Sequence, residues 1–175
     1  MLKIAGVTVV VLLAGLLAFA ATRPDTFRVE RSVTIRATPA KVHALIDDFH
    51  AWTQWSPWER MDPAMKRTYA GPARGKGALY AWDGNKAVGK GQMEIVASEP
   101  GDRLVIKLDF LAPFEAHNTA EFLLVPQGDA TRVTWAMHGP NLFVGKVMSL
   151  FASMDSLVGP EFERGLANLK AVAEK

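Results

Sequence analysis

The sequence predicts an α+β fold in which a curved antiparallel sheet wraps around a long C-terminal helix, with a separate apolar helix before the domain. Two patterns support the domain: strand-like alternation with short turns over residues 66–138, and helical spacing of apolar residues over 161–174. The apolar face of an antiparallel sheet must be covered, and only the C-terminal helix is large enough to cover it. Because a strongly twisted sheet does not lie flat against one helix, we expect a gap between them that suits a ligand.

The composition excludes several classes of protein. The chain has 175 residues, which suits one domain with an appendage, and its 49% of hydrophobic residues allow a buried core. It has no cysteine, which excludes disulfides, thiol nucleophiles and thiolate metal sites. From Pro24 onward basic and acidic residues are equal in number, because the surplus positive charges, Lys3 and Arg23, flank the N-terminal segment. A neutral domain argues against nucleic acid as its main partner.

The N-terminal segment predicts a membrane helix. Residues 4–21 carry no charge, and as a helix they would be about 27 Å long, close to the ~30 Å hydrocarbon core of a bilayer. We therefore expect residues 1–23 to form a single-pass transmembrane anchor and residues 24–175 to form the domain. The alternative is a secretory signal segment, since Ala18-Phe19-Ala20 has the pattern of a cleavage site, although the apolar run exceeds the usual length. The flanking charges orient the segment only weakly, and we expect the domain on the periplasmic side.

The first part of the domain predicts a strand followed by short helices. Residues 27–37 alternate apolar and polar side chains, as in a strand with one buried face. Thr38-Pro39 then provides an N-cap and a proline at the first helical position, and apolar residues follow at helical spacing from Val42 to Phe49. The next segment, 50–58, contains three tryptophans and a proline that stops the helix.

The remaining strands are joined by short turns. Asp83-Gly84 is typical of a hairpin between the runs at 79–82 and 87–96. Alternation continues in three further runs, near 104–110, 117–125 and 131–138. Five or six strands joined in this way predict an antiparallel meander. After the meander we expect a helix over 141–157, a break at Gly159-Pro160 and a final helix over 161–174.

This order of elements resembles the helix-grip fold of the START and Bet v 1-like (SRPBCC) superfamily. The residues that carry the resemblance are FRVERSVTI (27–35), TPAKV (38–42), WTQWSPW (52–58) and MDSLVGPEFERGLANLK (154–170). They are similar to the polyketide cyclase/dehydratase-like branch, many members of which have an N-terminal membrane helix. The resemblance covers nearly the whole domain and implies the fold. It does not imply one function, because the superfamily includes lipid carriers, hormone binders and cyclases.

Trp52, Trp55 and Trp58 form the densest aromatic cluster of the chain. Their spacing of three residues favours a structural role, in which the rings pin the short helices to the sheet. The alternative is that the rings line or gate the mouth of a pocket and offer indole N–H groups to a ligand. Trp135 shares a strand face with Met137, so we expect it in the core and in contact with the cavity.

The histidines show no metal-binding signature. They form no HxH or HExxH pattern, so we predict neither a metal nor another cofactor. We expect His43 to be solvated, because it lies opposite the apolar face of its helix. His117 and His138 lie on or near strands, and either could enter the cavity and act as a general base.

Cyclase or dehydratase chemistry would need an inward pair of acid–base groups. Besides His117 the candidates are Asp109, Glu121 and Asp155. The first two acids are out of phase with the apolar residues beside them, so we expect Asp109 and Glu121 to point to solvent. No Ser-His-Asp order or GxSxG motif is present, and we assign no catalytic residue.

The leading functional hypothesis is a membrane-tethered module that binds a lipid-like or other hydrophobic small molecule between the sheet and the C-terminal helix. The expected ligand-binding residues are Trp55, Trp58, Trp82, Phe110, His117, Phe122, Trp135, Met137, Phe151 and Phe162. The apolar segment 143–157 is a candidate lid. One alternative is a cyclase or dehydratase acting on a polyketide-like substrate in the same cavity, which an inward titratable pair would favour. Another is a structural or interaction domain, which a cavity too small for any ligand would favour.

Overall fold

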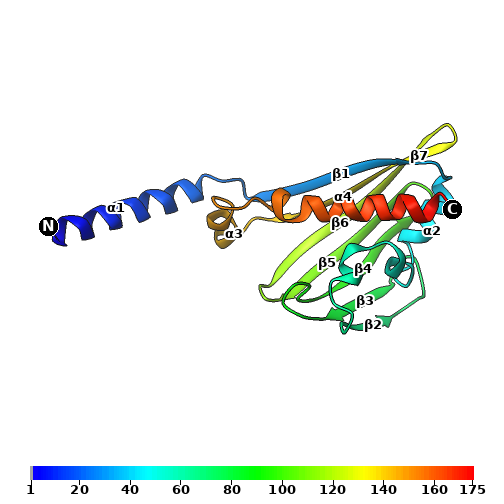
Figure 1. Ribbon diagram of the computed structural model, residues 1–175, viewed down its shortest axis with the longest axis horizontal. Helices are drawn as coiled ribbons and strands as arrows, with labels where there is room; N and C mark the ends of the chain where they lie inside the picture. The colour runs from blue at the N-terminus through cyan, green and yellow to red at the C-terminus, as the bar shows by residue number, and fades with distance from the viewer. Residues whose placement is uncertain (1) are drawn as a thin grey trace.

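The computed structural model describes the backbone of residues 2–175 and the side chains of residue 8 and residues 11–175. Its centre is a seven-stranded antiparallel sheet with the order β1-β7-β6-β5-β4-β3-β2. The strands are β1 (Thr26–Ile35), β2 (Lys66–Ala70), β3 (Leu79–Asp83), β4 (Lys90–Glu99), β5 (Arg103–Ala112), β6 (Ala116–Gln127) and β7 (Ala130–Pro140). The expected meander is confirmed, and the first strand joins it through β7 (Figure 1).

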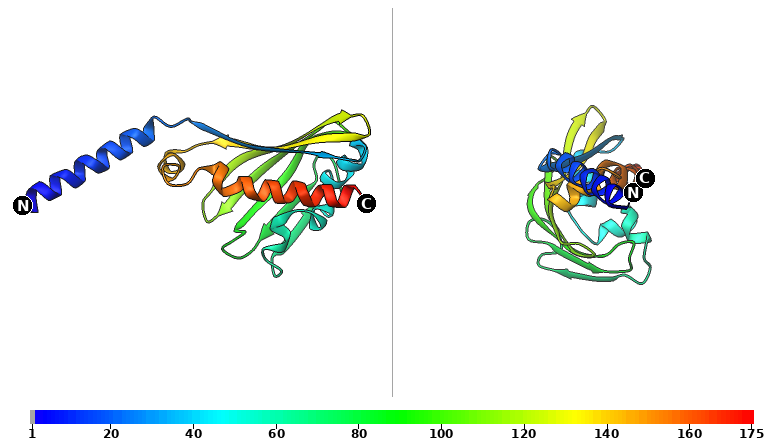
Figure 2. Two further views of the ribbon diagram at one scale, coloured as in Figure 1. Left: turned by 45° about the horizontal axis from the view of Figure 1, so that its top comes forward. Right: turned by 90° about the vertical axis from the view of Figure 1, so that its left-hand side faces the viewer.

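The sheet bends where the pairing of β4 with β5 is irregular. The register shifts between Lys90 and Gly91 and again between Ile95 and Ala97. Such bulges bend a strand and increase its local twist. In the end-on view of Figure 2 the sheet accordingly curls from β1 and β7 round to β2, which gives it a concave face.

Three short helices carry the chain from β1 at one edge of the sheet to β2 at the other edge. They are α2 (Pro39–Ile46) and the 3₁₀ helices η1 (Ala51–Gln54) and η2 (Pro57–Arg60). The expected N-cap of α2 is confirmed, because Thr38 Oγ1 accepts a hydrogen bond from Lys41 N at 3.3 Å.

Two tryptophans of the 52–58 cluster have a structural role. The indole nitrogens of Trp52 and Trp55 donate to the carbonyl oxygens of Ile46 and Leu45, each at 3.0 Å. These carbonyls belong to the last turn of α2 and have no partner within the helix. Both rings are also buried, so they hold the end of α2 against η1.

The segment after β7 differs from the single helix expected over 141–157. α3 (Phe143–Met148) is short, and the chain leaves helical geometry before α4 (Met154–Ala173) begins. Ser153 starts the new helix as its N-cap, since its Oγ accepts a hydrogen bond from Ser156 N at 3.1 Å.

The expected break at Gly159-Pro160 is wrong, because both residues lie inside α4. A proline at this position removes one helical hydrogen bond. The Arg31 guanidinium joins the turns on either side, with Nη1 2.7 Å from Asp155 Oδ1 and Nε 2.6 Å from Glu163 Oε1. A side chain at Gly159 would displace it, since a Cβ there would lie 2.2 Å from Arg31 Nη2. The ion pairs of Arg31 on β1 thus hold together the two helical turns that precede and follow Pro160.

The long C-terminal helix covers the sheet, as expected, but it does so near one edge. α4 runs along β1 (Figure 1). Its buried residues are Gly159, Phe162, Gly165, Leu166, Leu169 and Ala173. Gly165 permits close packing, because a Cβ there would come within 2.8 Å of the Trp135 ring. The concave surface of β3 to β5 is therefore left to the η1–η2 segment and to a cavity.

α1 (Leu2–Ala21) is the helix expected at the N-terminus, and it projects away from the domain (Figures 1 and 2). In the part of the chain that the structure describes, no helix combines the length and apolarity needed to cross a bilayer, so the expected transmembrane anchor is not supported. The segment between α1 and β1 contacts α3 and the residues just before it. Lys146 Nζ lies 2.5 Å from Asp25 Oδ1, and Asn141 N donates to Asp25 O at 2.7 Å.

We expect Leu169→Ala to lower the free energy of unfolding by about 2–5 kcal/mol, because it leaves a cavity under α4 where Leu169 is fully buried. Urea denaturation of the full chain measures this change. Leu157→Ala is the matched control on the same helix, since Leu157 is 56% exposed and its loss should change stability by less than about 0.5 kcal/mol. Equal effects of the two substitutions would contradict the packing of α4 described here.

Candidate ligand-binding site

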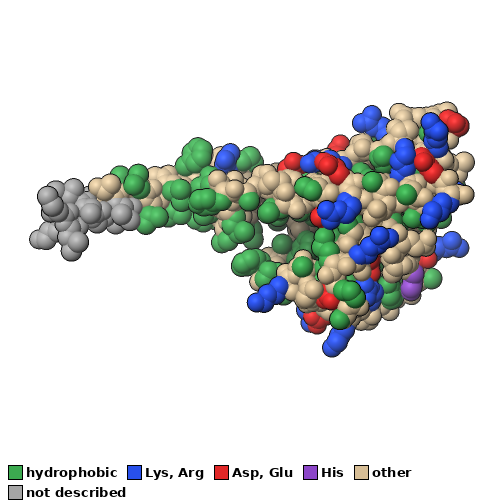
Figure 3. All heavy atoms as spheres, viewed as in Figure 1, with side chains coloured by type: hydrophobic (Ala, Val, Ile, Leu, Met, Phe, Trp, Pro, Cys, Tyr) green, Lys and Arg blue, Asp and Glu red, His purple; other side chains and the backbone are tan. Residues whose placement is uncertain are grey.

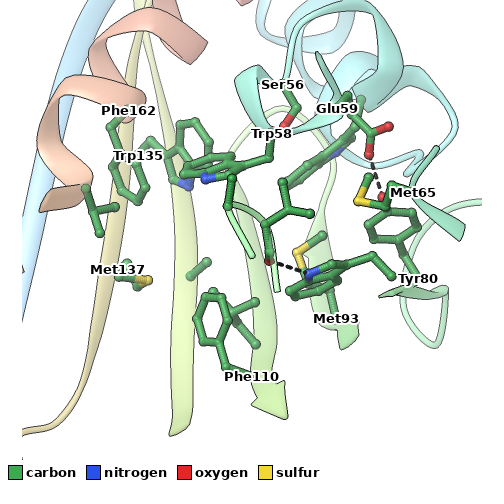
Figure 4. Close-up of a pocket in the computed structure, with 17 residues that line it drawn as sticks. Ser56, Trp58, Glu59, Met65, Tyr80, Met93, Phe110, Trp135, Met137 and Phe162 are labelled. Atoms are coloured by element: carbon green, nitrogen blue, oxygen red, sulfur yellow. Dashed lines mark hydrogen bonds between the residues drawn. The ribbon is translucent and has the colours of Figure 1, made fainter. Parts of the chain in front are cut away.

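A cavity of about 230 Å³ lies between the concave face of the sheet, α4 and the η1–η2 segment (Figure 4). Its lining is almost entirely aromatic and aliphatic. The lining residues are Trp52, Ser56, Trp58, Glu59, Met65, Tyr80, Trp82, Ala87, Val88, Met93, Leu108, Phe110, Ala120, Trp135, Met137, Val158 and Phe162. The gap expected between sheet and helix is therefore present, and the η1–η2 segment supplies a third wall.

Most of the expected ligand-binding residues line this cavity. They are Trp58, Trp82, Phe110, Trp135, Met137 and Phe162. Trp55 and Phe122 are fully buried in the adjoining core and are not part of the lining. His117 and Phe151 lie elsewhere. The position of these side chains is now known, whereas their contact with a ligand stays a prediction.

His117 points away from the cavity, so its expected entry into the cavity is wrong. The buried positions of β6 include Asn118, Ala120 and Phe122, and strand alternation directs His117 to the opposite face. Its side chain is 61% exposed. The sequence does not show which face of the sheet His117 lies on. Its neighbours, Ala116 and Asn118, are not the large apolar residues that would identify the inner face of β6.

Asp109 lies on the same outer face as His117, as expected, but it is buried and not solvated. Its carboxylate contacts His117 Nδ1 at 2.7 Å, Lys107 Nζ at 2.9 Å and Gln92 Nε2 at 3.2 Å. Burial raises the pKa of Asp109, but the hydrogen bonds from His117, Lys107 and Gln92 outweigh it and lower the pKa to about 2. The hydrogen bond to Asp109 in turn raises the pKa of His117 above its ordinary value. Because His117 and Gln92 are the cross-strand partners of Asp109, this network ties β4, β5 and β6 together outside the cavity.

Phe151 lies in the connection between α3 and α4 and is 79% exposed. A continuous helix over 141–157 would have turned Phe151 to the same side as Val147. The interruption after Met148 instead leaves it facing solvent, so the expected contact with the cavity is wrong.

Several aromatic rings pack against Trp135. Its two faces stack on Phe162, with ring centroids 4.2 Å apart, and on Phe122, with centroids 4.9 Å apart. Trp55 and Trp58 meet it edge to face at 5.5 and 5.7 Å. Such pairs each add about 0.5–1.5 kcal/mol beyond the burial of their area, and they fix the plane of the Trp135 ring.

The indole nitrogen of Trp135 is buried without a hydrogen-bond partner among the described residues. A buried donor without an acceptor costs about 1–3 kcal/mol, and such groups are rare in folded proteins. The indole of Trp82, which also lines the cavity, has a partner, since its nitrogen donates to Val88 O at 3.0 Å.

Glu59 and Tyr80 form the polar end of the cavity, and Arg67 pairs with Glu59 beside it. Tyr80 Oη donates to Glu59 Oε1 at 2.5 Å, and Arg67 Nε lies 2.6 Å from Glu59 Oε2. Burial and then the hydrogen bond to Glu59 raise the pKa of Tyr80, so the phenol remains protonated. The hydrogen bond to Glu59 also raises the pKa of Arg67. The sequence offered a signal for Tyr80, which alternates with Trp82 on β3, but none for Glu59, which lies in a 3₁₀ turn without periodicity.

His43 is buried, which corrects the expectation that it is solvated. Its Nε2 lies 3.3 Å from Ser98 Oγ, and its Nδ1 lies 4.0 Å from Asp47 Oδ2. The helical pattern of α2 indicates only which face meets the core. It does not reveal that the end of β4, with Ser98, covers the opposite face.

No group of three or more His, Asp or Glu side chains within the described residues lies close enough to hold a metal ion. Apart from the tryptophan indoles, the polar side chains that line the cavity are Ser56, Glu59 and Tyr80.

Comparisons with known proteins agree with this architecture. The profile of a family described as polyketide cyclase / dehydrase and lipid transport matches residues 26–174. No curated protein matches the chain.

Several solved structures have a similar fold. A protein from Thermobifida fusca is 24% identical with a TM-score of 0.61, covering 82% of this chain and 90% of that one. The di-domain ARO/CYC protein BexL is 16% identical with a TM-score of 0.63, covering 91% of this chain and 53% of that one. Major latex-like protein 151 from Panax ginseng is 13% identical with a TM-score of 0.62, covering 87% of this chain and all of that one (100%). These likenesses show the fold alone, and they are consistent with the expected helix-grip arrangement.

We expect the contribution of His117 to stability to depend on pH. Its pKa is raised from the ordinary 6.5, so the pair with Asp109 contributes fully below about pH 6.5 and is lost as the pH rises through the higher folded pKa. His117→Ala should therefore lower the free energy of unfolding more at pH 6 than at pH 9, as measured by urea denaturation. Thr119→Ala, at the next outward position of β6, should have the same effect at both pH values. A loss for His117→Ala that does not change with pH would count against the pair.

Proposed function

Because the chain belongs to the polyketide cyclase/dehydrase and lipid transport family, we propose that its domain binds a hydrophobic small molecule in the cavity beneath α4. The observation that carries the proposal is the cavity of about 230 Å³ with its aromatic and aliphatic lining. An apolar cavity of about 150 Å³ is already large enough to bind benzene. The space therefore suits a ligand of roughly two rings or a short acyl chain.

The cavity also weighs against a purely structural domain. A core without a ligand is close-packed and has few voids larger than a water molecule. Here Leu108, Ala120 and Met137, from the inner face of three neighbouring strands, border an empty space of about 230 Å³. A ligand would supply the contacts that these side chains lack.

The Glu59–Tyr80 pair favours a second candidate, an enzyme of cyclase or dehydratase type, because both side chains line the cavity and share a hydrogen bond. Two features weigh against catalysis. The carboxylate oxygens of Glu59 are already engaged by Tyr80 and Arg67, and the raised pKa of Tyr80 keeps its proton in place. The pair can position a ligand but offers no free base, so we place binding ahead of catalysis.

We propose further that the domain works against a lipid surface. Apolar side chains are exposed around α3 in a group that we name the α3 patch, formed by Leu142, Phe143, Val144, Phe151 and Leu157. The exposed apolar side chains of α1 lie beside it, and Figure 3 shows hydrophobic atoms gathered where α1 meets the domain. Contiguous exposed apolar surface is typical of sites that contact a partner or a membrane.

The position of the α3 patch supports a route between lipid and cavity. α3 connects β7 to α4, and the adjoining ends of these elements carry the lining residues Met137 and Val158. In the sequence, one lining residue thus comes shortly before the α3 patch and another directly after it. A ligand drawn from a bilayer at the α3 patch would therefore start near the lining residues Met137 and Val158.

We expect Ala120→Leu to weaken the binding of small apolar probes, because the larger side chain extends into the cavity that Ala120 lines and takes up space that a probe needs. Isothermal titration calorimetry with tetralin and with decanol measures binding to the wild type, and the variant should bind at least roughly tenfold more weakly.

The matched control for this test is Thr119→Leu, which enlarges the neighbouring side chain on the outer face of β6. It should leave the affinities unchanged. A wild-type protein that binds neither probe would overturn the proposed function, and so would an Ala120→Leu variant that binds as well as the wild type and is equally stable.

The proposed contact with lipid predicts that the full chain floats with phosphatidylcholine–phosphatidylglycerol vesicles. Replacing Phe143 and Phe151 together by serine should reduce the bound fraction roughly tenfold, because two exposed aromatic rings no longer enter the lipid. The control replaces Leu123 and Val125, each 42% exposed on β6, by serine and should bind as the wild type does. Equal binding by both double variants would refute a role of the α3 patch.

A further inference from the structure

Ser56 is the N-cap of η2, yet its hydroxyl group does not cap that helix. The hydroxyls of Thr38 and Ser153, which precede α2 and α4, each accept a hydrogen bond from a backbone N–H of their helix. Ser56 Oγ makes no such bond and has no other hydrogen-bond partner among the described residues. The Ser56 hydroxyl is therefore available to a molecule from outside the chain.

This hydroxyl is reached from the cavity. Ser56 is 3% exposed and belongs to the cavity lining. Its oxygen keeps accessible surface, since Trp135 Nε1 is the one buried side-chain polar atom in the described part of the chain that is both unpaired and sealed from any probe. Buried polar groups normally have a hydrogen-bond partner, so a ligand in the cavity is the partner that this position favours.

The polar side chains of the lining lie toward one end of the cavity. Figure 4 shows Ser56 and Glu59 on the side of the η1–η2 segment, whereas Phe110 and Met137 bound the opposite end. Among the described lining residues Glu59 is the only one with a charged side chain, and Arg67 already pairs with it. The cavity therefore has a polar end without a free cation and an apolar end.

We infer that the ligand is a neutral amphiphile bound in one direction, with a hydroxyl group at Ser56 and its hydrocarbon toward Phe110 and Met137. This inference rests on the proposed function and specifies the ligand of that same site. A hydroxyl both donates and accepts, which suits an end where the Tyr80 proton is already given to Glu59.

A charged head group does not fit the same end. An anion would lose its hydration beside the Glu59 carboxylate, and the Arg67 guanidinium is already engaged by that carboxylate. A cation would lose its hydration as well, for a carboxylate that Arg67 already neutralises. A neutral head group avoids both costs.

The first test compares two probes that differ in one hydroxyl group, tetralin and 5,6,7,8-tetrahydro-2-naphthol, by calorimetry on the full chain. We expect Ser56→Ala to weaken the binding of the naphthol roughly fivefold and to leave tetralin within about twofold, because alanine removes only the hydroxyl. Ser32→Ala is the matched control. It removes an exposed hydroxyl on β1 and should change neither affinity.

The charge of the head group is tested with 5,6,7,8-tetrahydro-2-naphthoate at pH 7.5, which has the same rings and a carboxylate. The wild type should bind it at least roughly tenfold more weakly than the naphthol. Equal affinity for the two would overturn the inference.

The outcomes separate the inference from the proposed function. If tetralin and the naphthol both bind and Ser56→Ala affects them equally, the inference is overturned while the binding function stands. If neither probe binds, the proposed function fails and the inference fails with it.

A second measurement gives the direction of the ligand without the Ser56 variant. In wild type labelled with ¹³C at the methionine methyl groups, the Met137 methyl, identified by its absence from Met137→Leu, should show nuclear Overhauser contacts to the saturated ring of the naphthol. Contacts to the ring protons beside its hydroxyl would overturn the inference.

Discussion

Trp135 is the residue on which the three layers of this domain meet. Its ring lies between Phe122 of β6 and Phe162 of α4, and the tryptophans of the η1–η2 segment abut its edge. The sheet, the C-terminal helix and the crossover helices therefore share one aromatic stack. This stack needs α4 to approach the sheet closely, and Gly165 allows it, because any side chain there would collide with the Trp135 ring.

The same arrangement explains why a cavity remains. α4 is held to the β1 side of the sheet by the aromatic stack and by the ion pairs of Arg31 with Asp155 and Glu163. The bulges of β4 curve the other half of the sheet away from it. The η1–η2 segment closes part of this space and brings the Glu59 carboxylate to its edge. A mainly apolar pocket with few polar groups is the usual composition of a site for a small hydrophobic ligand.

The sequence predicted those features that depend on local periodicity. Alternation along β7 placed Trp135 and Met137 on one face, and the Thr38-Pro39 pair identified the start of α2. The features it missed depend on contacts between distant segments. Pro160 is a local helix-breaking signal, yet α4 continues past it, because Arg31 on β1 pairs with Asp155 before the proline and with Glu163 after it. Likewise Asp109 is polar and out of phase, and only the register of β4 and β6 shows that Gln92 and His117 cover it.

The candidate site was predictable to a similar degree. Aromatic residues such as Trp82 and Phe110 line the cavity, and their inward direction follows from the period of two along a strand; their contact with a ligand stays a prediction. The polar end of the cavity was not identified, since Glu59 belongs to an irregular turn and meets Tyr80 only in the folded chain. The missing acceptor of Trp135 is likewise invisible in the sequence, because it depends on the carbonyl groups that surround the folded ring.

The pairing of β1 with β7 has a consequence for the order in which the molecule forms. β1 is synthesised well before its partner strand β7, which spans Ala130–Pro140, and before α4, which packs along it. Contacts between such distant segments form slowly, because a long loop has to close first. During synthesis β1 is thus an unpaired strand directly behind an apolar helix, a state that is prone to aggregate. The domain therefore cannot complete its fold until β7 and α4 have both been made.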